Sequence, residues 1–220
     1  MSINAFIFDL DGVITDTAQQ HYEAWKSIAD ENGWQFNKTV NSLLKGVSRM
    51  ASLDIILQTN NLQNAFSDAE KASLAHTKNA RYVALIETLT PDDILPGITA
   101  FLNELREGGY RIALASASKN AGTVLTRLGL ENAFDYVADA ALIQAAKPDP
   151  EVFLNCVSAL GLLPCECVGV EDAAAGVAAI ANAGMRSIGI NVEGCTVQPD
   201  IMLASTKELV LAKMIKALGE

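Results

Sequence analysis

Two carboxylates, Asp9 and Asp11, stand one residue apart directly after the hydrophobic run of residues 5–8. The run predicts a buried strand whose carboxyl end carries both acids. Side chains two apart on a strand point the same way, so both acids could face one crevice, although the turn at Gly12 could redirect the second. Buried charges are costly unless an opposite charge or a metal ion compensates them. Because Asp-Gly is also common in ordinary turns, the pair alone leaves both interpretations open.

Three more stretches carry polar side chains that one sheet would gather at its strand ends; two of them end predicted strands, and the third places a lysine before two prolines, which hold the chain extended. They are "LASAS" with Ser116 and Ser118, "KPDP" with Lys147, and "VGVED" with Glu171 and Asp172. Each has an ordinary explanation: a solvated serine, a surface lysine and an acid that caps a helix. Together they favour a site, because the carboxyl ends of parallel strands meet at one edge of a sheet, where ligands bind.

The chemistry that such a set supports is phosphoryl transfer. A carboxylate can act as the nucleophile and become an aspartyl phosphate. Mg²⁺ held by carboxylates, together with a lysine, reduces the repulsion between an anionic nucleophile and a phosphate. A serine hydroxyl can hydrogen-bond a phosphoryl oxygen, and a second, protonated carboxyl group can protonate the leaving oxygen.

The surrounding pattern predicts the α/β class, with a Rossmann-like parallel sheet core and an inserted helical cap domain. Short β-like runs separated by helical patterns cover residues 5–8, 111–115, 136–138, 167–170 and 187–190. From about residue 18 to residue 89 only helical patterns occur, and Ser67 with Glu70 fits a capping box at the start of the last helix. We therefore predict a core domain of residues 1–16 and 91–220 and a cap domain of residues 17–90.

Composition excludes several classes of function. The net charge of −10 over 220 residues argues against non-specific binding of nucleic acid or anionic membranes. The longest near-apolar stretch is too short to span a bilayer, and the N-terminus lacks the basic region of a signal peptide. The four cysteines form no CxxC pair, which favours free thiols in a reducing compartment over a zinc site. We expect a cytoplasmic protein.

In this order, "DLDGV", "SAS", "KPDP" and "GVEDAAAG" resemble the four motifs of the haloacid dehalogenase-like phosphotransferases. The resemblance extends over nearly the whole chain. Within that family, "DLDGVITDTAQQHYEAW", "LKGVSRMASL", "KNARYV" and "ALASASKN" are similar to the β-phosphoglucomutase branch, and "LKGVSR" is the most specific of these strings. One departure is Ala173, which stands where many relatives have serine; it removes no charge or metal ligand.

The resemblance implies a role for each matching position. Asp9 would be the nucleophile and a Mg²⁺ ligand, and Asp11 the general acid/base, also on the metal. Arg49 would grip the phosphate that is not transferred. The implied catalytic residues are Asp9, Asp11, Ser116 and Lys147, and the implied metal ligands are Asp9, Asp11, Glu171 and Asp172. The implied substrate-binding residues are Thr17, His21, Trp25, Lys45, Gly46, Val47, Ser48, Arg49, Ser52, Lys78, Ser116, Ala117, Asn120 and Lys147.

The implied reaction interconverts β-D-glucose 1-phosphate and D-glucose 6-phosphate through an aspartyl-phosphate enzyme and β-glucose 1,6-bisphosphate. The expected cofactor is Mg²⁺, the expected partners are small sugar phosphates, and we expect a monomer. One alternative is a Mg-dependent hexose-phosphate phosphatase on the same scaffold, which would differ in how well the cap excludes water. A more distant alternative is a receiver-type phospho-signalling module, although such a module has no need of a large helical insertion.

Overall fold

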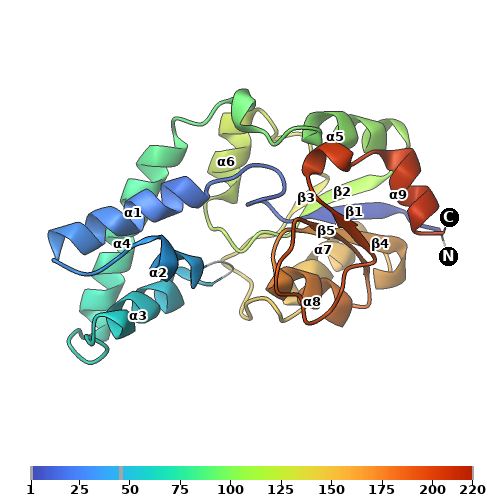
Figure 1. The fold of residues 1–220 in the computed structure, drawn as a ribbon. Coiled ribbons are helices and arrows are strands. Elements are labelled where there is room, and N and C mark those ends of the chain that lie inside the picture. Colours follow the sequence, from blue (N-terminus) through green and yellow to red (C-terminus); the bar gives the residue numbers. More distant parts are fainter. Residues whose placement is uncertain (1, 45–46, 220) are drawn as a thin grey trace. The chain divides into compact units, whose positions relative to one another are not determined.

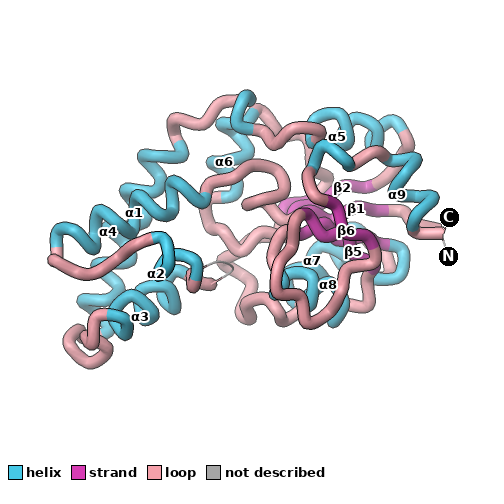
Figure 2. The backbone as a smooth tube through the Cα atoms, viewed as in Figure 1, coloured by secondary structure: helices cyan, strands magenta, loops and turns pink. Residues whose placement is uncertain are grey.

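The computed structural model describes residues 2–44 and 47–219, and within them six parallel strands form one sheet in the order β3-β2-β1-β4-β5-β6. By contacts between Cα atoms the chain divides into two compact units, Met1–Asp16 with Thr90–Glu220 and Thr17–Leu89. We call the first the α/β unit and the second the helical unit. Figure 2 shows that the strands belong to the α/β unit.

The central strand β1 (Ala5–Phe8) is buried along its whole length and pairs with β2 (Arg111–Leu114) and β4 (Cys167–Glu171). A strand covered on both faces needs hydrophobic side chains at every position, which explains its unbroken apolar sequence. Beyond β4 and β2 the sheet continues through the strands β3 (Tyr136–Val137), β5 (Arg186–Ile190) and β6 (Ile201–Leu203).

Helices cover both faces of this sheet (Figure 1). Helices α5 (Ile98–Glu107) and α9 (Leu211–Ala217) contact each other on one face, and α7 (Glu151–Leu160) and α8 (Ala174–Asn182) contact each other on the other. Helix α6 (Ala121–Leu128) contacts the 3₁₀ turn Pro91–Asp93, and two further 3₁₀ turns span Pro164–Glu166 and Thr206–Glu208.

Alternate residues of β1 supply the two halves of the core. Phe6 and Phe8 point to the α5 face, where both rings meet Phe101 edge-on at centroid distances of 5.5 and 6.0 Å. Ala5 and Ile7 belong instead to a cluster that includes side chains of α7 and α8. The period of two along the strand therefore sends alternate side chains into two different layers of the core.

The helical unit contains α1 (Ala18–Glu31), α2 (Lys38–Ser42), α3 (Arg49–Thr59) and α4 (Asp68–Ile86). Its own core includes Trp25, Ile28, Leu53 and Ile56. The capping box predicted at Ser67 and Glu70 is present: the Ser67 hydroxyl accepts the Glu70 N–H, and the Glu70 carboxylate accepts the Ser67 N–H.

A buried polar group lies in the helical unit between α1 and α4. The Lys78 Nζ lies 2.7 Å from His21 Nδ1, and the imidazole stacks on the Tyr82 ring at 4.0 Å. The Tyr82 hydroxyl lies 3.0 Å from the hydroxyl of Thr17. Burial, reinforced by the charges of Lys78 and Arg49, lowers the pKa of His21 to about 3. A neutral imidazole can accept the hydrogen bond that the Lys78 ammonium donates.

The α/β fold class that the sequence predicts is confirmed, and the five expected strands are present within one residue at each end. The sixth strand, β6, was not predicted. It has three residues, lies at the edge of the sheet and buries only Leu203, so its apolar run is too short to stand out as a strand. No helix among the described residues is both long enough and apolar enough to cross a bilayer.

Gly169 in β4 provides a test of the contact between the sheet and α8. A Cβ at this position would lie 2.5 Å from side-chain atoms of Ile180, so Gly169→Ala must displace that side chain or the helix that carries it, and should lower the free energy of unfolding by about 1–3 kcal/mol. The matched control is Gly122→Ala in α6, where a Cβ meets nothing within 4 Å, and which should stabilise the chain by about 0.5–1 kcal/mol. Urea unfolding followed by circular dichroism measures both. Equal stability of Gly169→Ala and wild type would contradict the proposed packing.

His21 makes the stability of the helical unit depend on pH. The folded-state pKa of about 3 lies below the ordinary value of 6.5, so between these values the unfolded chain binds a proton that the folded chain excludes. Stability should therefore fall as the pH falls through this window, by at most about 1.4 kcal/mol per pH unit. Both tryptophans, Trp25 and Trp34, lie in the helical unit, so urea unfolding followed by fluorescence reports on it.

His21→Gln should flatten that pH dependence, because its amide oxygen can still accept from Lys78 but does not titrate. His76→Gln, which removes an exposed histidine, should retain the wild-type slope. Identical slopes for wild type and His21→Gln would show that His21 does not control the pH dependence.

Candidate functional site

The ends of three neighbouring strands place Asp9, Ser116 and Glu171 at one edge of the sheet. Phe8 is in register with Leu114 of β2 and with Val170 of β4. The ladder continues one step further, because the Asp9 N–H donates to the Val170 carbonyl over 2.9 Å. The nucleophile candidate is thus held by a backbone hydrogen bond at the carboxyl end of a fully buried strand.

Lys147 joins two of the acids. Its Nζ lies 2.6 Å from Asp9 Oδ1 and 2.6 Å from Glu171 Oε1. All three side chains are nearly buried, with exposed fractions of 13% for Asp9, 8% for Lys147 and 2% for Glu171. The ammonium also lies 5.0 Å from the centre of the Phe153 ring. Short charge-assisted hydrogen bonds of this kind are strong because little water competes for them.

The second oxygen of Glu171 is also engaged. Its Oε2 accepts the N–H groups of Asp172 and Ala173, both at 2.8 Å, at the start of α8. Gly176 packs against the same carboxylate, since a Cβ there would lie 1.9 Å from Oε1. Glu171 is therefore fixed from three directions, and it in turn fixes the position of Lys147.

The Asp172 carboxylate lies close to the turn that carries Asp11. A Cβ on Gly12 would lie 2.1 Å from Asp172 Oδ2, so the Asp172 carboxylate lies against the residue that follows Asp11. Gly12 also has a φ of +76°, in the turn that its N–H closes onto the Thr15 carbonyl over 2.7 Å. Glycine is required here twice, for its backbone conformation and for the space that the carboxylate fills.

The charges of this cluster shift its pKa values. Burial raises the pKa of Asp9 to about 8, Glu171 and Asp11 push it in the same direction, and Lys147 opposes them. Burial alone would lower the pKa of Lys147, but the charges of Asp9 and Glu171 outweigh it and the pKa is raised overall. For this coupled pair the geometry supports a charged lysine. Asp9 and Glu171 thus share the Lys147 cation, and their excess negative charge favours binding of a further cation.

The acids fit Mg²⁺ by their chemistry. Carboxylate oxygens are the ligands that this ion prefers, and Gly12 leaves the space in which Asp172 approaches the backbone beside Asp11. Over residues 2–44 and 47–219, however, no group of three or more His, Cys, Asp or Glu side chains is already arranged to hold a metal. Lys147, lying between Asp9 and Glu171, supplies the positive charge in this arrangement.

The serine loop after β2 forms the adjoining part of the site. Ser116 is buried, and its hydroxyl accepts the N–H of Ser118 over 3.1 Å. The Ser118 hydroxyl accepts the N–H of Asn120, the residue that precedes α6. Ala117, between Ser116 and Ser118, is exposed.

The helical unit brings together a different set of the predicted residues. Arg49 is the first residue of α3, after the capping Ser48, and its charge acts on His21. Burial lowers the pKa of Arg49, and a smaller electrostatic contribution from Tyr82 opposes this. Lys78 and Ser52 are buried, as is Trp25, whose ring centre lies 5.4 Å from the Lys78 ammonium. Val47 is half-buried, and the predicted Lys45 and Gly46 lie outside the described residues.

Sequence reasoning missed several supporting residues. Phe153 lies under the Lys147 ammonium, Gly176 packs against Glu171, and Tyr82 connects Thr17 with His21 and Lys78. The only sequence signal for Gly176 was the small-residue character of α8. Phe153 and Tyr82 looked like ordinary core residues of amphipathic helices, and nothing in their spacing distinguished them.

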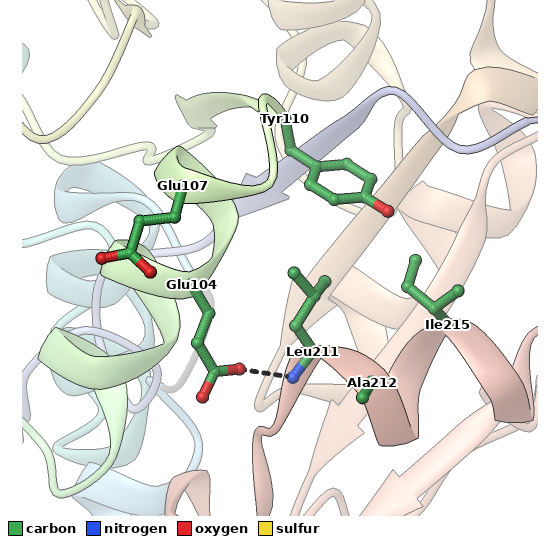
Figure 3. A pocket seen from close by; sticks show the side chains of 6 residues that line it. All are labelled: Glu104, Glu107, Tyr110, Leu211, Ala212 and Ile215. Atoms are coloured by element: carbon green, nitrogen blue, oxygen red, sulfur yellow. Dashed lines mark hydrogen bonds between the residues drawn. The ribbon is translucent and has the colours of Figure 1, made fainter.

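A separate hollow of about 440 Å³ lies between α5 and α9 (Figure 3). The Glu104 carboxylate crosses it to accept the Leu211 N–H over 2.7 Å. Tyr110, which lines it, directly precedes β2, whereas Ser116 follows that strand. This hollow therefore lies toward the opposite end of β2 from the acids and takes no part in their chemistry.

Comparisons with known proteins agree with this geometry. Residues 3–184 match the family described as "Hydrolase: haloacid dehalogenase-like hydrolase". The β-phosphoglucomutase of Bacillus subtilis is 41% identical over 95% of this chain and 92% of its own. A crystal structure of β-phosphoglucomutase from Clostridium difficile superposes with a TM-score of 0.93 at 44% identity, covering 98% of this chain and 96% of that one.

A phosphorylated carbohydrates phosphatase of Thermotoga maritima is 28% identical over 84% of each chain. The match to the family covers most of the chain, including the residues from which the acid cluster is built. The chain belongs to the haloacid dehalogenase-like hydrolase family.

Proposed function

We propose that this protein is a β-phosphoglucomutase that interconverts β-D-glucose 1-phosphate and D-glucose 6-phosphate. The observation that carries the chemistry is the Lys147 ammonium 2.6 Å from Asp9 Oδ1, at the carboxyl end of β1. The choice of sugar phosphate is supported by the two β-phosphoglucomutases at 41% and 44% identity, which are more similar to this chain than the phosphatase at 28%.

In the proposed reaction an Asp9 oxygen attacks phosphorus, and the bond between phosphorus and the sugar oxygen breaks. Asp11 gives its proton to that leaving oxygen and takes a proton from the sugar hydroxyl when the phosphoryl group returns. Lys147 and the Ser116 hydroxyl would hold the phosphoryl oxygens. The intermediate β-glucose 1,6-bisphosphate rebinds in the reversed orientation, so each phosphate is transferred in turn.

Mg²⁺, which we propose is held by Asp9, Asp11, Glu171 and Asp172, would supply positive charge that reduces repulsion between Asp9 and the phosphate. The proximity of these acids supports the assignment: the charges of Asp11 and Glu171 already raise the pKa of Asp9, and a cation would reverse that effect. Glu171 can still bind the metal, because each carboxylate oxygen has two lone pairs. Its Oε1 accepts one hydrogen bond, from Lys147, so a lone pair of this oxygen remains available.

The helical unit would bind the sugar and the phosphate that is not transferred. The charges in this unit support the proposal: Arg49 and Lys78 bring two cations near a neutral His21. Arg49 stands at the N-terminus of α3, where the helix dipole disfavours a cation. A guanidinium in this unfavourable place is better explained by an anionic ligand than by helix stability, and it can bind a phosphate through two parallel hydrogen bonds. The other predicted residues of this unit, Lys45 and Gly46 included, remain part of the proposed sugar site.

A cap that closes on bound sugar would exclude water from the aspartyl phosphate, and we propose this role for the helical unit. We further propose that the protein acts as a cytoplasmic monomer. The receiver-type alternative is disfavoured, because the 73-residue helical unit, Thr17–Leu89, has no function in a signalling module of that type.

The second candidate is a sugar-phosphate phosphatase, which the Thermotoga maritima relative favours. A product assay separates the two. With β-glucose 1-phosphate, Mg²⁺ and a trace of bisphosphate, we expect glucose 6-phosphate to accumulate with little free phosphate. Release of one phosphate for each sugar phosphate consumed would establish the phosphatase instead.

Asp9→Asn tests the nucleophile. The amide has nearly the same shape but cannot form the acyl phosphate, so we expect no phosphoenzyme in intact-protein mass spectra and a loss of turnover of about 10⁴-fold or more. Asp92→Asn changes an exposed carboxylate of the same unit and should retain wild-type behaviour. A phosphoenzyme formed by Asp9→Asn would assign the nucleophile to another residue.

A further inference from the structure

The loop that carries Lys147 runs from β3 to α7, over residues 138–150. Irregular loops are usually mobile, yet this one holds an ammonium 2.6 Å from each of two buried oxygens. A lysine side chain has four rotatable bonds and loses much conformational freedom when it is fixed. The position of its backbone therefore decides whether both contacts form together.

Before Lys147, the loop is held by Glu151. A single oxygen of this side chain, Oε2, accepts the N–H of Gln144 over 2.9 Å and the N–H of Ala145 over 2.6 Å. Glu151 is itself the first residue of α7, and its own N–H donates to Asp149 Oδ1 over 2.9 Å. The carboxylate thus connects the loop to a helix that is anchored in the core through Phe153.

After Lys147, the loop is held from a different helix. The side-chain amide of Asn182 donates from Nδ2 to the Pro148 carbonyl over 2.9 Å. Asn182 is the last residue of α8, the helix whose first turn follows Glu171. Lys147 therefore lies between two fixed points, residues 144–145 and Pro148.

We propose that Glu151 and Asn182 are positioning residues that clamp this loop and thereby hold the Lys147 ammonium against Asp9 and Glu171. Neither side chain contacts the acids in the described structure. Both act through the loop backbone, and a small displacement of Lys147 would separate it from the nucleophile that it serves. The consequence for catalysis rests on the proposed function, whereas the consequence for the loop does not.

The two backbone N–H groups that donate to Glu151 Oε2 allow a matched pair of variants at Glu151. Glu151→Ala removes the acceptor. Glu151→Gln removes the charge but keeps an oxygen that can accept both N–H groups. Asn182→Ala removes the second contact independently. Glu208→Ala is the control, because the Glu208 carboxylate likewise accepts a loop N–H, that of Ala204, in a different loop.

The first readout needs no substrate. Two rates are measured on variants that circular dichroism shows to be folded. One is the rate at which acetic anhydride acetylates Lys147, followed by mass spectrometry. The other is the rate of hydrogen exchange at the backbone N–H groups of Gln144 and Ala145. We expect Glu151→Ala to accelerate both by about tenfold or more, and Asn182→Ala to accelerate acetylation, because each opens the loop locally. Glu151→Gln and Glu208→Ala should stay within about threefold of wild type. Acceleration no greater than that of Glu208→Ala would overturn the clamp.

The second readout is kinetic. Glu151→Ala should lower kcat and the rate of phosphoenzyme formation by about tenfold or more while KM changes by less than about threefold, and Glu151→Gln should restore both. A Gln variant as impaired as Ala would assign the effect to charge at the start of α7 and contradict the clamp. If wild type forms no phosphoenzyme, the proposed function fails, and the acetylation and exchange rates still decide the clamp.

Discussion

The contact on which the α/β unit depends is the Lys147 ammonium held between Asp9 and Glu171. Each of these groups would be costly to bury alone, and removing one would leave the others without compensation. The sheet provides two of the three members, because β1 and β4 are neighbours and end together. The third arrives on a loop, and the Phe153 ring and the backbone N–H groups that bind Glu171 complete the surroundings of the triad.

The two units differ in the sign of the charge that they collect. The strand ends place Asp9 and Glu171 on one lysine, and burial, together with the charges of Glu171 and Asp11, raises the pKa of Asp9 against the opposing charge of Lys147. The helical unit instead places Arg49 and Lys78 beside a histidine that burial keeps neutral. Negative charge suits a nucleophile that works with a cation, and positive charge suits an anionic substrate. Both features follow from the proposed reaction, which needs an activated carboxylate and a second phosphate site.

Much of this arrangement could be predicted because it is expressed in local sequence. Apolar runs located five of the strands, and a polar residue directly after such a run indicated the acid and serine positions. The lysine was indicated by the "KPDP" stretch. The supporting contacts could not be predicted, because they join distant residues that have ordinary local roles. Glu151 looks like a helix-start acid and Asn182 like a helix-end amide, and only the fold shows that both hold the Lys147 loop. The direct link between Lys147 and both acids likewise depends on the order of the strands.

The difference between a mutase and a phosphatase cannot lie in the acid cluster, because both reactions form the same aspartyl phosphate. It must lie in what reaches that intermediate, a sugar hydroxyl or water. The feature of this chain that bears on the choice is Arg49, a half-buried guanidinium at the start of α3. Its position in the first turn of α3 opposes the helix dipole, which costs some helix stability. Residues that reduce stability are characteristic of binding sites, where a ligand supplies the missing interaction. The second phosphate site that we propose at Arg49 would fit a bisphosphate intermediate, whereas hydrolysis of a monophosphate would make no use of it.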